Sequence, residues 1–207
     1  SDLGVDVQAG EACSAGDVTT SYLRENHAGD EVLVVGSAGL QEQLETAGIS
    51  LTADPSSADV LLGSWTPSFD YEDMNVALQA VDEGTTFLGT DPDRTFPREG
   101  GVEPGSGAII HSLAATTGME PDAILGKPSE HALELATDRL GVPATETLVV
   151  GDRLSTDLTM GARAGMTTVL VLTGVTDRSD VADSSIDPDY VIDGFGDIDD
   201  VLSDIGV

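Results

Sequence analysis

The chain has 207 residues, of which 40% are hydrophobic, and it carries a formal net charge of -30 at pH 7. This length allows a buried core in one large domain or two small ones, and the hydrophobic content excludes the composition of a disordered acidic chain. The charge disfavours nucleic-acid phosphates and anionic membranes as partners.

Basic residues are scarce: seven arginines and the single lysine Lys127 stand against 38 acidic residues. Repulsion among dispersed acidic groups is screened at high salt, where the Debye length falls to about 3 Å at 1 M. The composition therefore indicates a protein of a salt-accumulating halophile. The lone Cys13 indicates a reducing compartment, so we expect a cytoplasmic location. No apolar stretch reaches the length of a transmembrane helix, and no secretion signal is visible.

Short apolar runs alternate with helical patterns along the chain. The pattern predicts strands at 32–36, 59–63, 85–89, 147–150, 167–172 and 190–192, and helices at 40–47, 73–81, 109–114, 129–140, 157–164 and 197–205. Strands separated by helices of this length indicate parallel β-α-β units with right-handed crossovers. A Gly/Pro-rich stretch at 97–107 is the best candidate for a hinge between domains.

Three charged residues, Lys127, Asp152 and Asp157, occupy positions that suit phosphate and metal binding. The apolar run 147–150 ends in Gly151 and Asp152, and Asp157 begins the next expected helix. Ligands of open parallel sheets bind beyond the carboxyl ends of the strands. Two carboxylates there suit Mg²⁺, which takes few protein ligands and completes its shell with water and phosphate. Lys127 provides a compact ammonium that an arginine fork does not replace. Asp157 alone also fits an ordinary acid at a helix start.

These motifs resemble the haloacid dehalogenase-like (HAD) phosphatases, in particular their p-nitrophenylphosphatase/NagD-like branch. The matching segments are Gly126-Lys127-Pro128, Gly151 to Asp157, Gly165-Met166, Val171 to Val175, Cys13-Ser14-Ala15, Val35-Gly36, Thr90 to Asp93, Pro104 to Gly107 and Pro188 to Ile192.

The resemblance implies an α/β fold, with a Rossmann-like parallel-sheet core and an inserted α/β cap. We expect a first core segment at 1–29, the cap at 30–110 and the rest of the core at 111–207. It also implies Mg²⁺ as cofactor and hydrolysis of a phosphate ester through an aspartyl-phosphate, and it allows a homo-oligomer formed through the cap.

Carried over to this sequence, Lys127 is the catalytic residue that neutralises the nucleophile and the phosphoryl oxygens. By the same resemblance, Asp152 would bind the metal, Asp157 would support that metal site, and Gly151 would belong to the substrate-binding residues.

The sequence departs from the family pattern at its beginning. The family's nucleophile lies in an Asp-x-Asp motif at the end of the first core strand, and no such motif precedes Cys13. The segment Asp2 to Asp6 follows no strand and does not fit. We therefore expect the sequence to begin downstream of the nucleophile and to lack the central core strand.

Asp91-Pro92-Asp93-Arg94-Thr95 formally fits the nucleophile motif, because it follows an apolar strand. Too few residues separate it from Lys127 for the β-α unit and return strand that the pattern needs. As a loop of the cap, Asp91, Asp93 and Arg94 are instead expected to bind substrate. Arg94 could pair with a substrate carboxylate or a second phosphate. Trp65 is either a cap contact or ordinary packing.

The expected activity is that of a Mg²⁺-dependent phosphatase-like hydrolase of a small phosphorylated metabolite, such as a sugar phosphate or phosphoglycolate, with p-nitrophenyl phosphate as artificial substrate. One alternative is a non-catalytic protein that keeps the phosphate and metal pocket. Another is a receiver-type domain, which also uses aspartates, Mg²⁺ and a lysine, but the family match extends through a long insertion before Lys127 that disfavours it.

Overall fold

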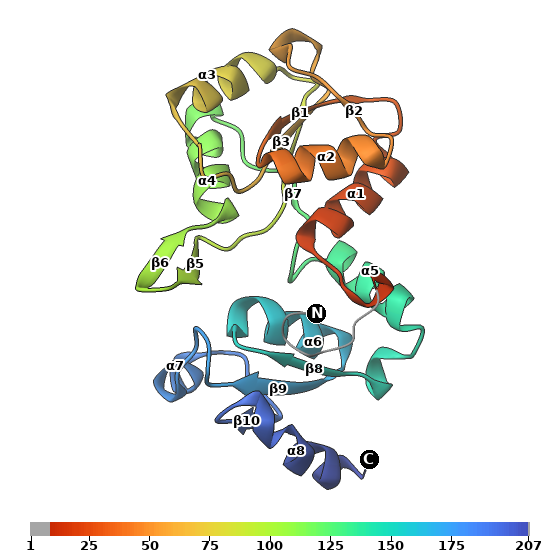
Figure 1. Cartoon of the computed structure of the whole chain (residues 1–207), viewed down its shortest axis with the longest axis vertical. Helices are drawn as coiled ribbons and strands as arrows, with labels where there is room; N and C mark the ends of the chain where they lie inside the picture. The colour runs from red at the N-terminus through yellow and green to blue at the C-terminus, as the bar shows by residue number, and fades with distance from the viewer. Residues whose placement is uncertain (1–8, 207) are drawn as a thin grey trace. The chain divides into compact units, whose positions relative to one another are not determined.

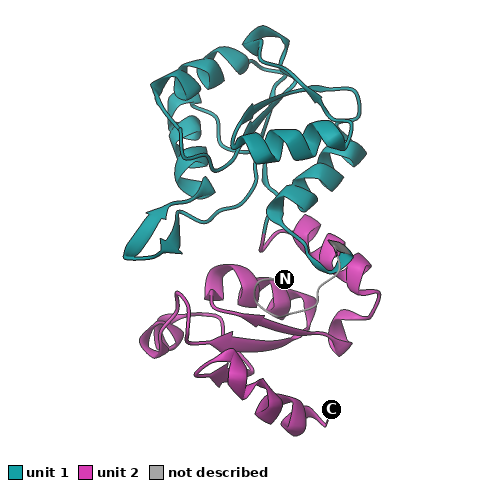
Figure 2. Cartoon of the chain, in the orientation of Figure 1, with its two compact units in different colours: residues 1–126 teal, residues 127–207 magenta. Residues whose placement is uncertain are grey.

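A computed structural model describes residues 9–206. The chain divides into two compact units, residues 1–126 (unit 1) and residues 127–207 (unit 2), which Figure 2 colours separately. Both units are built on parallel sheets, so the expected α/β class is confirmed. The segment Asp2 to Asp6 lies outside the described residues.

Unit 1 contains a five-stranded sheet in the order β2-β1-β3-β4-β7, and all neighbouring strands are parallel. Its strands are β1 (Glu31–Val35), β2 (Ser50–Leu51), β3 (Val60–Gly63), β4 (Thr86–Gly89) and β7 (Ala123–Ile124). The central strand β3 is buried along its whole length, which explains its continuous apolar sequence. The three long strands are those that the sequence predicts, whereas the two-residue edge strands β2 and β7 are too short to give a pattern.

The helices of unit 1 cover this sheet in two pairs (Figure 1). They are α1 (Ala15–Asn26), α2 (Ala38–Thr46), α3 (Tyr71–Ala80) and α4 (Ser106–Thr117), with 3₁₀ turns at Ala9–Glu11 and Pro55–Ser57. Helices α3 and α4 pack on β1, β3 and β4 through one apolar core that includes Leu61, Phe87 and Leu113. Asp70 caps α3 by accepting hydrogen bonds from the first-turn amides of Glu72 and Asp73.

The Gly/Pro-rich stretch expected as a hinge lies inside unit 1 instead. It forms an antiparallel hairpin of β5 (Thr95–Arg98) and β6 (Gly101–Pro104), followed directly by α4. A Cβ on Gly107 would lie 2.3 Å from the carbonyl oxygen of Pro92, so this glycine permits close backbone packing. The units divide after Gly126, whereas the expected cap boundary at 110/111 falls within α4. The assignment of cap and core to particular residues stays a prediction.

Unit 2 contains a three-stranded parallel sheet in the order β10-β9-β8. Its elements are α5 (Glu130–Leu140), a 3₁₀ turn (Ala144–Glu146), β8 (Leu148–Gly151), a π-helical turn (Leu154–Leu158), α6 (Thr159–Ala164), β9 (Thr167–Val171), α7 (Arg178–Asp183), β10 (Tyr190–Ile192), a 3₁₀ turn (Phe195–Asp197) and α8 (Ile198–Ile205). Since β8 and β9 are parallel, the residues that follow them lie at the same edge of the sheet.

Among the described helices, none is both long and apolar enough to cross a membrane.

Candidate functional site

The only lysine of the chain forms an ion pair with Asp157 within unit 2. The Nζ atom of Lys127 lies 2.5 Å from Oδ1 of Asp157 and donates a hydrogen bond to it. The Asp157 side chain is 12% exposed and the Lys127 side chain 53% exposed. The fold therefore brings together two of the three charged residues that the sequence predicts for the site, and leaves the ammonium accessible to solvent.

Asp157 lies in the π-helical turn Leu154–Leu158, where the amide of Leu158 donates to the carbonyl of Arg153 at 3.2 Å. Such wide turns are rare and occur frequently at functional sites. Gly151 admits this turn, because a Cβ at that position would lie only 2.3 Å from Cβ of Asp157. The glycine that the sequence assigns to substrate binding therefore contacts Asp157. Its proposed contact with substrate stays a prediction.

Asp152 follows β8 directly and is fixed by the segment that follows β9. Its Oδ2 atom accepts a hydrogen bond from the amide of Val175 at 2.9 Å, and its carbonyl oxygen accepts one from the amide of Thr176 at 3.2 Å. The residue is half-buried. It lies at the carboxyl end of a parallel strand, as the sequence predicts, although its contact with Val175 has no signal in the sequence.

The chemistry of these two carboxylates fits a magnesium ion. Among residues 9–206, one oxygen of each carboxylate is held by a hydrogen bond, Oδ2 of Asp152 by the Val175 amide and Oδ1 of Asp157 by Lys127. The other oxygen of each remains available to a ligand. No cluster of three or more His, Cys, Asp or Glu residues suited to a metal exists in the described part of the chain. The fit rests on donor chemistry, because Mg²⁺ takes carboxylate oxygens together with waters and phosphate.

The residues expected to bind substrate, Asp91, Asp93 and Arg94, lie in unit 1 after β4. Oδ1 of Asp91 accepts a hydrogen bond from the amide of Asp93 at 3.2 Å, and the hydroxyl of Thr90 donates to Oδ2 at 3.3 Å. This carboxylate therefore stabilises its own turn, a common role for aspartate in loops. Arg94 is exposed. The assignment of the three residues to substrate binding stays a prediction.

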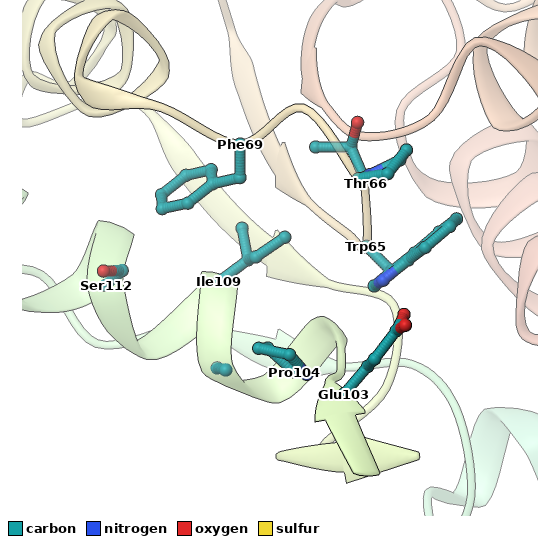
Figure 3. Close-up of a pocket in the computed structure, with 9 residues that line it drawn as sticks. Trp65, Thr66, Phe69, Glu103, Pro104, Ile109 and Ser112 are labelled. Atoms are coloured by element: carbon teal, nitrogen blue, oxygen red, sulfur yellow. The ribbon is translucent and has the colours of Figure 1, made fainter. Parts of the chain in front are cut away.

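Unit 1 also contains a cavity of about 430 Å³ that the sequence does not predict (Figure 3). Its walls come from the loop after β3, the β5–β6 hairpin and the start of α4, with Trp65, Phe69, Glu103 and Ile109 among the lining residues. The Trp65 ring meets the ring of Phe96 edge to face, with centroids 5.7 Å apart. Of the two readings open for Trp65, packing within unit 1 is the one that this contact supports.

This chain is similar in sequence to known phosphatases. Residues 124–198 match the HAD-hydrolase-like family model. The chain is 33% identical to an acid sugar phosphatase of Staphylococcus epidermidis over 91% of its own length and 72% of that protein. It is 30% identical to the sugar-phosphatase AraL of Bacillus subtilis over 94% of its length and 71% of that protein.

Solved structures agree with these relatives. The p-nitrophenyl phosphatase of Archaeoglobus fulgidus superposes with a TM-score of 0.88 at 36% identity, covering 97% of this chain and 78% of that protein. NagD of E. coli gives a TM-score of 0.81 at 30% identity, covering 93% and 74% respectively.

The relatives and the shared fold identify a phosphoric monoester hydrolase with a parallel-sheet core. The chain belongs to the haloacid dehalogenase-like hydrolases, and its solved neighbours include p-nitrophenylphosphatases and NagD. The resemblance inferred from the sequence motifs is thus confirmed. The expectation that the nucleophile segment is missing is not borne out by these comparisons.

Proposed function

We propose that this protein is a Mg²⁺-dependent phosphatase of small phosphorylated metabolites, with sugar phosphates as its substrate class. The observation that carries the proposal is the Lys127–Asp157 ion pair at 2.5 Å, in the same unit as Asp152 at the end of β8. The substrate class is supported by the names of two relatives, an acid sugar phosphatase and the sugar-phosphatase AraL.

Lys127 is the residue assigned to charge neutralisation. Phosphoryl transfer spreads negative charge over the phosphoryl oxygens, and catalysis depends on positioned positive groups that stabilise this charge. An ammonium has three donors around one compact charge, so Lys127 can bind Asp157 and a phosphoryl oxygen together. Its half-exposed side chain leaves donors free for that second contact.

Asp152 and Asp157 are the residues assigned to hold the metal. Bound Mg²⁺ would supply further positive charge to the phosphoryl group. The amide of Val175 orients one oxygen of Asp152, and Lys127 orients one oxygen of Asp157. Such hydrogen bonds from neighbouring groups fix the direction in which a metal-binding carboxylate points. No residue of this sequence is assigned as the nucleophile.

The function is tested with the full-length protein on p-nitrophenyl phosphate and a panel of sugar phosphates, with EDTA or added Mg²⁺. We expect turnover only with a divalent ion, and faster turnover of sugar phosphates than of phosphate esters without a sugar ring. Asp152→Asn should reduce turnover by at least about 100-fold, since even groups that only orient a ligand cost about 10–100-fold. Asp187→Asn, an exposed carboxylate in the same unit, serves as the charge-matched control.

A protein that binds Mg²⁺ and phosphate but turns over no ester would instead support the non-catalytic alternative. An Asp152→Asn variant within a few-fold of the wild type would contradict the metal assignment. The cytoplasmic location and a homo-oligomer formed through the expected cap at 30–110 also stay predictions.

A further inference from the structure

The segment that follows β9 holds Asp152 at two points. Leu172 to Thr176 follows β9 at the sheet edge where β8 ends, because the two strands are parallel. From it, the amide of Val175 donates to the carboxylate of Asp152, and the amide of Thr176 donates to its carbonyl oxygen. Thr176 is itself buried, with 7% of its surface exposed. Consecutive amides of one segment therefore fix both the main chain and the side chain of Asp152.

Gly174 precedes these two amides and leaves no space for a side chain. A Cβ at this position would lie 2.1 Å from Oδ2, 2.3 Å from Cβ and 2.4 Å from Cγ of Asp152. Such separations are far below van der Waals contact, so a Cβ would have to displace the carboxylate or the segment. Gly174 is not among the glycines with positive φ, so its backbone conformation is open to other residues. The requirement for glycine is therefore steric, and the atoms nearest to the missing Cβ are those of Asp152.

We propose that Gly174 is a positioning residue for the metal site: its missing side chain lets the Val175 amide hold Oδ2 of Asp152 and thereby directs Oδ1 toward the cation. This inference rests on the proposed function, because it takes Asp152 as a Mg²⁺ ligand. Neither Gly174 nor Val175 contacts the substrate. Gly174 and Val175 act only through the orientation of one carboxylate.

The contact with Val175 is made by its main-chain amide, and the Val175 side chain is 48% exposed. The position that tests this contact is therefore Gly174. Gly196 offers a matched control, since a Cβ there would meet no atom within 4 Å and its φ is not positive.

The test is a calorimetric titration of the full-length protein with Mg²⁺, with Mn²⁺ electron paramagnetic resonance as a spectroscopic readout of the bound ion. Gly174→Ala should weaken Mg²⁺ affinity by about 10–100-fold, the usual cost of losing a group that orients a metal ligand. Gly196→Ala should bind Mg²⁺ as the wild type does. In an Asp152→Asn background, Gly174→Ala should produce no further loss, because residues that act through one group are not additive.

Wild-type Mg²⁺ affinity in a folded Gly174→Ala variant would overturn the inference. If Gly174→Ala weakened Mg²⁺ affinity equally in the wild type and in the Asp152→Asn background, the inference would also fall. Gly174 would then not act through the Asp152 carboxylate. Failure of the wild type to bind Mg²⁺ would instead refute the metal assignment in the proposed function.

If Gly174→Ala does not fold, amide hydrogen exchange of the wild type tests whether the Val175 amide holds the Asp152 carboxylate. The Val175 amide proton should be protected from exchange and should lose that protection in Asp152→Ala. Equal exchange rates in the two proteins would show that this amide does not hold the carboxylate, and the inference would fall.

Discussion

Lys127 and Asp157 form an ion pair across 30 positions of sequence, with Nζ of the lysine 2.5 Å from Oδ1 of the aspartate. The pair joins the first residue of unit 2 to the π-helical turn after β8. The lysine of this pair is half-exposed and the aspartate is nearly buried, whereas pairs at the surface add only about 0–1 kcal/mol to the free energy of unfolding. A stability gain of this size does not explain why this position holds the only lysine beside seven arginines, and the pair is the one that we propose for catalysis.

Lys127→Arg tests this assignment. The planar guanidinium keeps the charge but is larger and cannot act as a compact charge between a carboxylate and a phosphoryl oxygen. We expect turnover of p-nitrophenyl phosphate to fall by about 100-fold or more, as on removal of a charge-stabilising donor. Lys127→Ala should lose at least as much. Steady-state kinetics measure the loss, and circular dichroism confirms that both variants are folded. An arginine variant with normal turnover would leave the lysine without a catalytic role.

Gly151→Ala should affect Asp157 specifically. The added Cβ would meet Cβ of Asp157 at 2.3 Å, so the π-helical turn or the strand end must shift. Overpacking of this kind costs about 1–3 kcal/mol in the free energy of unfolding. We expect a lower midpoint in urea together with weaker Mg²⁺ binding.

Gly196→Ala, for which the added Cβ meets no neighbour, is the control for Gly151→Ala. An unchanged urea midpoint in Gly151→Ala would show that the close approach of Gly151 to Asp157 is absent in solution.

Much of this site could be predicted from the sequence, because its signals are local. The apolar run before Gly151 marks a buried strand, and Asp152 is the residue that follows it. The approach of Gly174 to Asp152 could not be predicted. It depends on the register of β8 against β9, which pairs Gly151 with Leu170 and which no local pattern encodes.

In unit 1 as well, local sequence patterns predict single elements but not how these elements pack. The run at 60–63 is apolar throughout and was predicted as a strand, because both faces of a central parallel strand are buried. The stretch 97–107, which overlaps the β5–β6 hairpin, is expected as a hinge, since its glycines and prolines signal a turn and a hinge alike. Only the packing of α4 on the sheet, through residues such as Ile110, shows that this stretch lies within a compact unit.

Arg94→Ala tests the expected substrate-binding role of the loop after β4. Arg94 is exposed, so its removal should change the thermal midpoint little. If it binds an anionic group of the substrate, KM should rise for substrates that carry a second anionic group, with a smaller change for p-nitrophenyl phosphate. Arg98→Ala is the control, because Arg98 already pairs with Glu103 at 3.2 Å. Equal KM values for Arg94→Ala and the wild type would remove Arg94 from the site.

Stability should depend strongly on salt, because the formal net charge is -30. The Debye length falls from about 10 Å at 0.1 M to about 3 Å at 1 M, so added salt screens the repulsion between surface carboxylates. We expect the midpoint of thermal unfolding to rise steeply between about 0.1 and 2 M KCl. Differential scanning calorimetry across this range is the measurement. A flat curve would contradict the halophile interpretation.

Low pH should destabilise unit 2, because protonation of Asp189 weakens its hydrogen bonds to Thr168. Oδ2 of this residue accepts hydrogen bonds from both the amide and the hydroxyl of Thr168, each at 2.8 Å, and so ties the segment before β10 to β9. The bond from the Thr168 amide, followed by that from its hydroxyl, lowers the pKa of the Asp189 carboxyl below its ordinary value. The folded state therefore favours the ionised carboxylate.

The sign of the pH effect follows from that shift. A carboxyl with a depressed pKa in the folded state stabilises the protein above its unfolded pKa of about 3.9, and this contribution is lost as the pH falls through the folded pKa. Asp189→Asn should therefore lower the thermal midpoint at pH 6 and show a smaller further loss than the wild type as the pH falls from about 5 to 3. Asp187→Asn controls for removal of one charge. Midpoints of Asp189→Asn that run parallel to those of the wild type over this range would show that the contact with Thr168 does not contribute to stability.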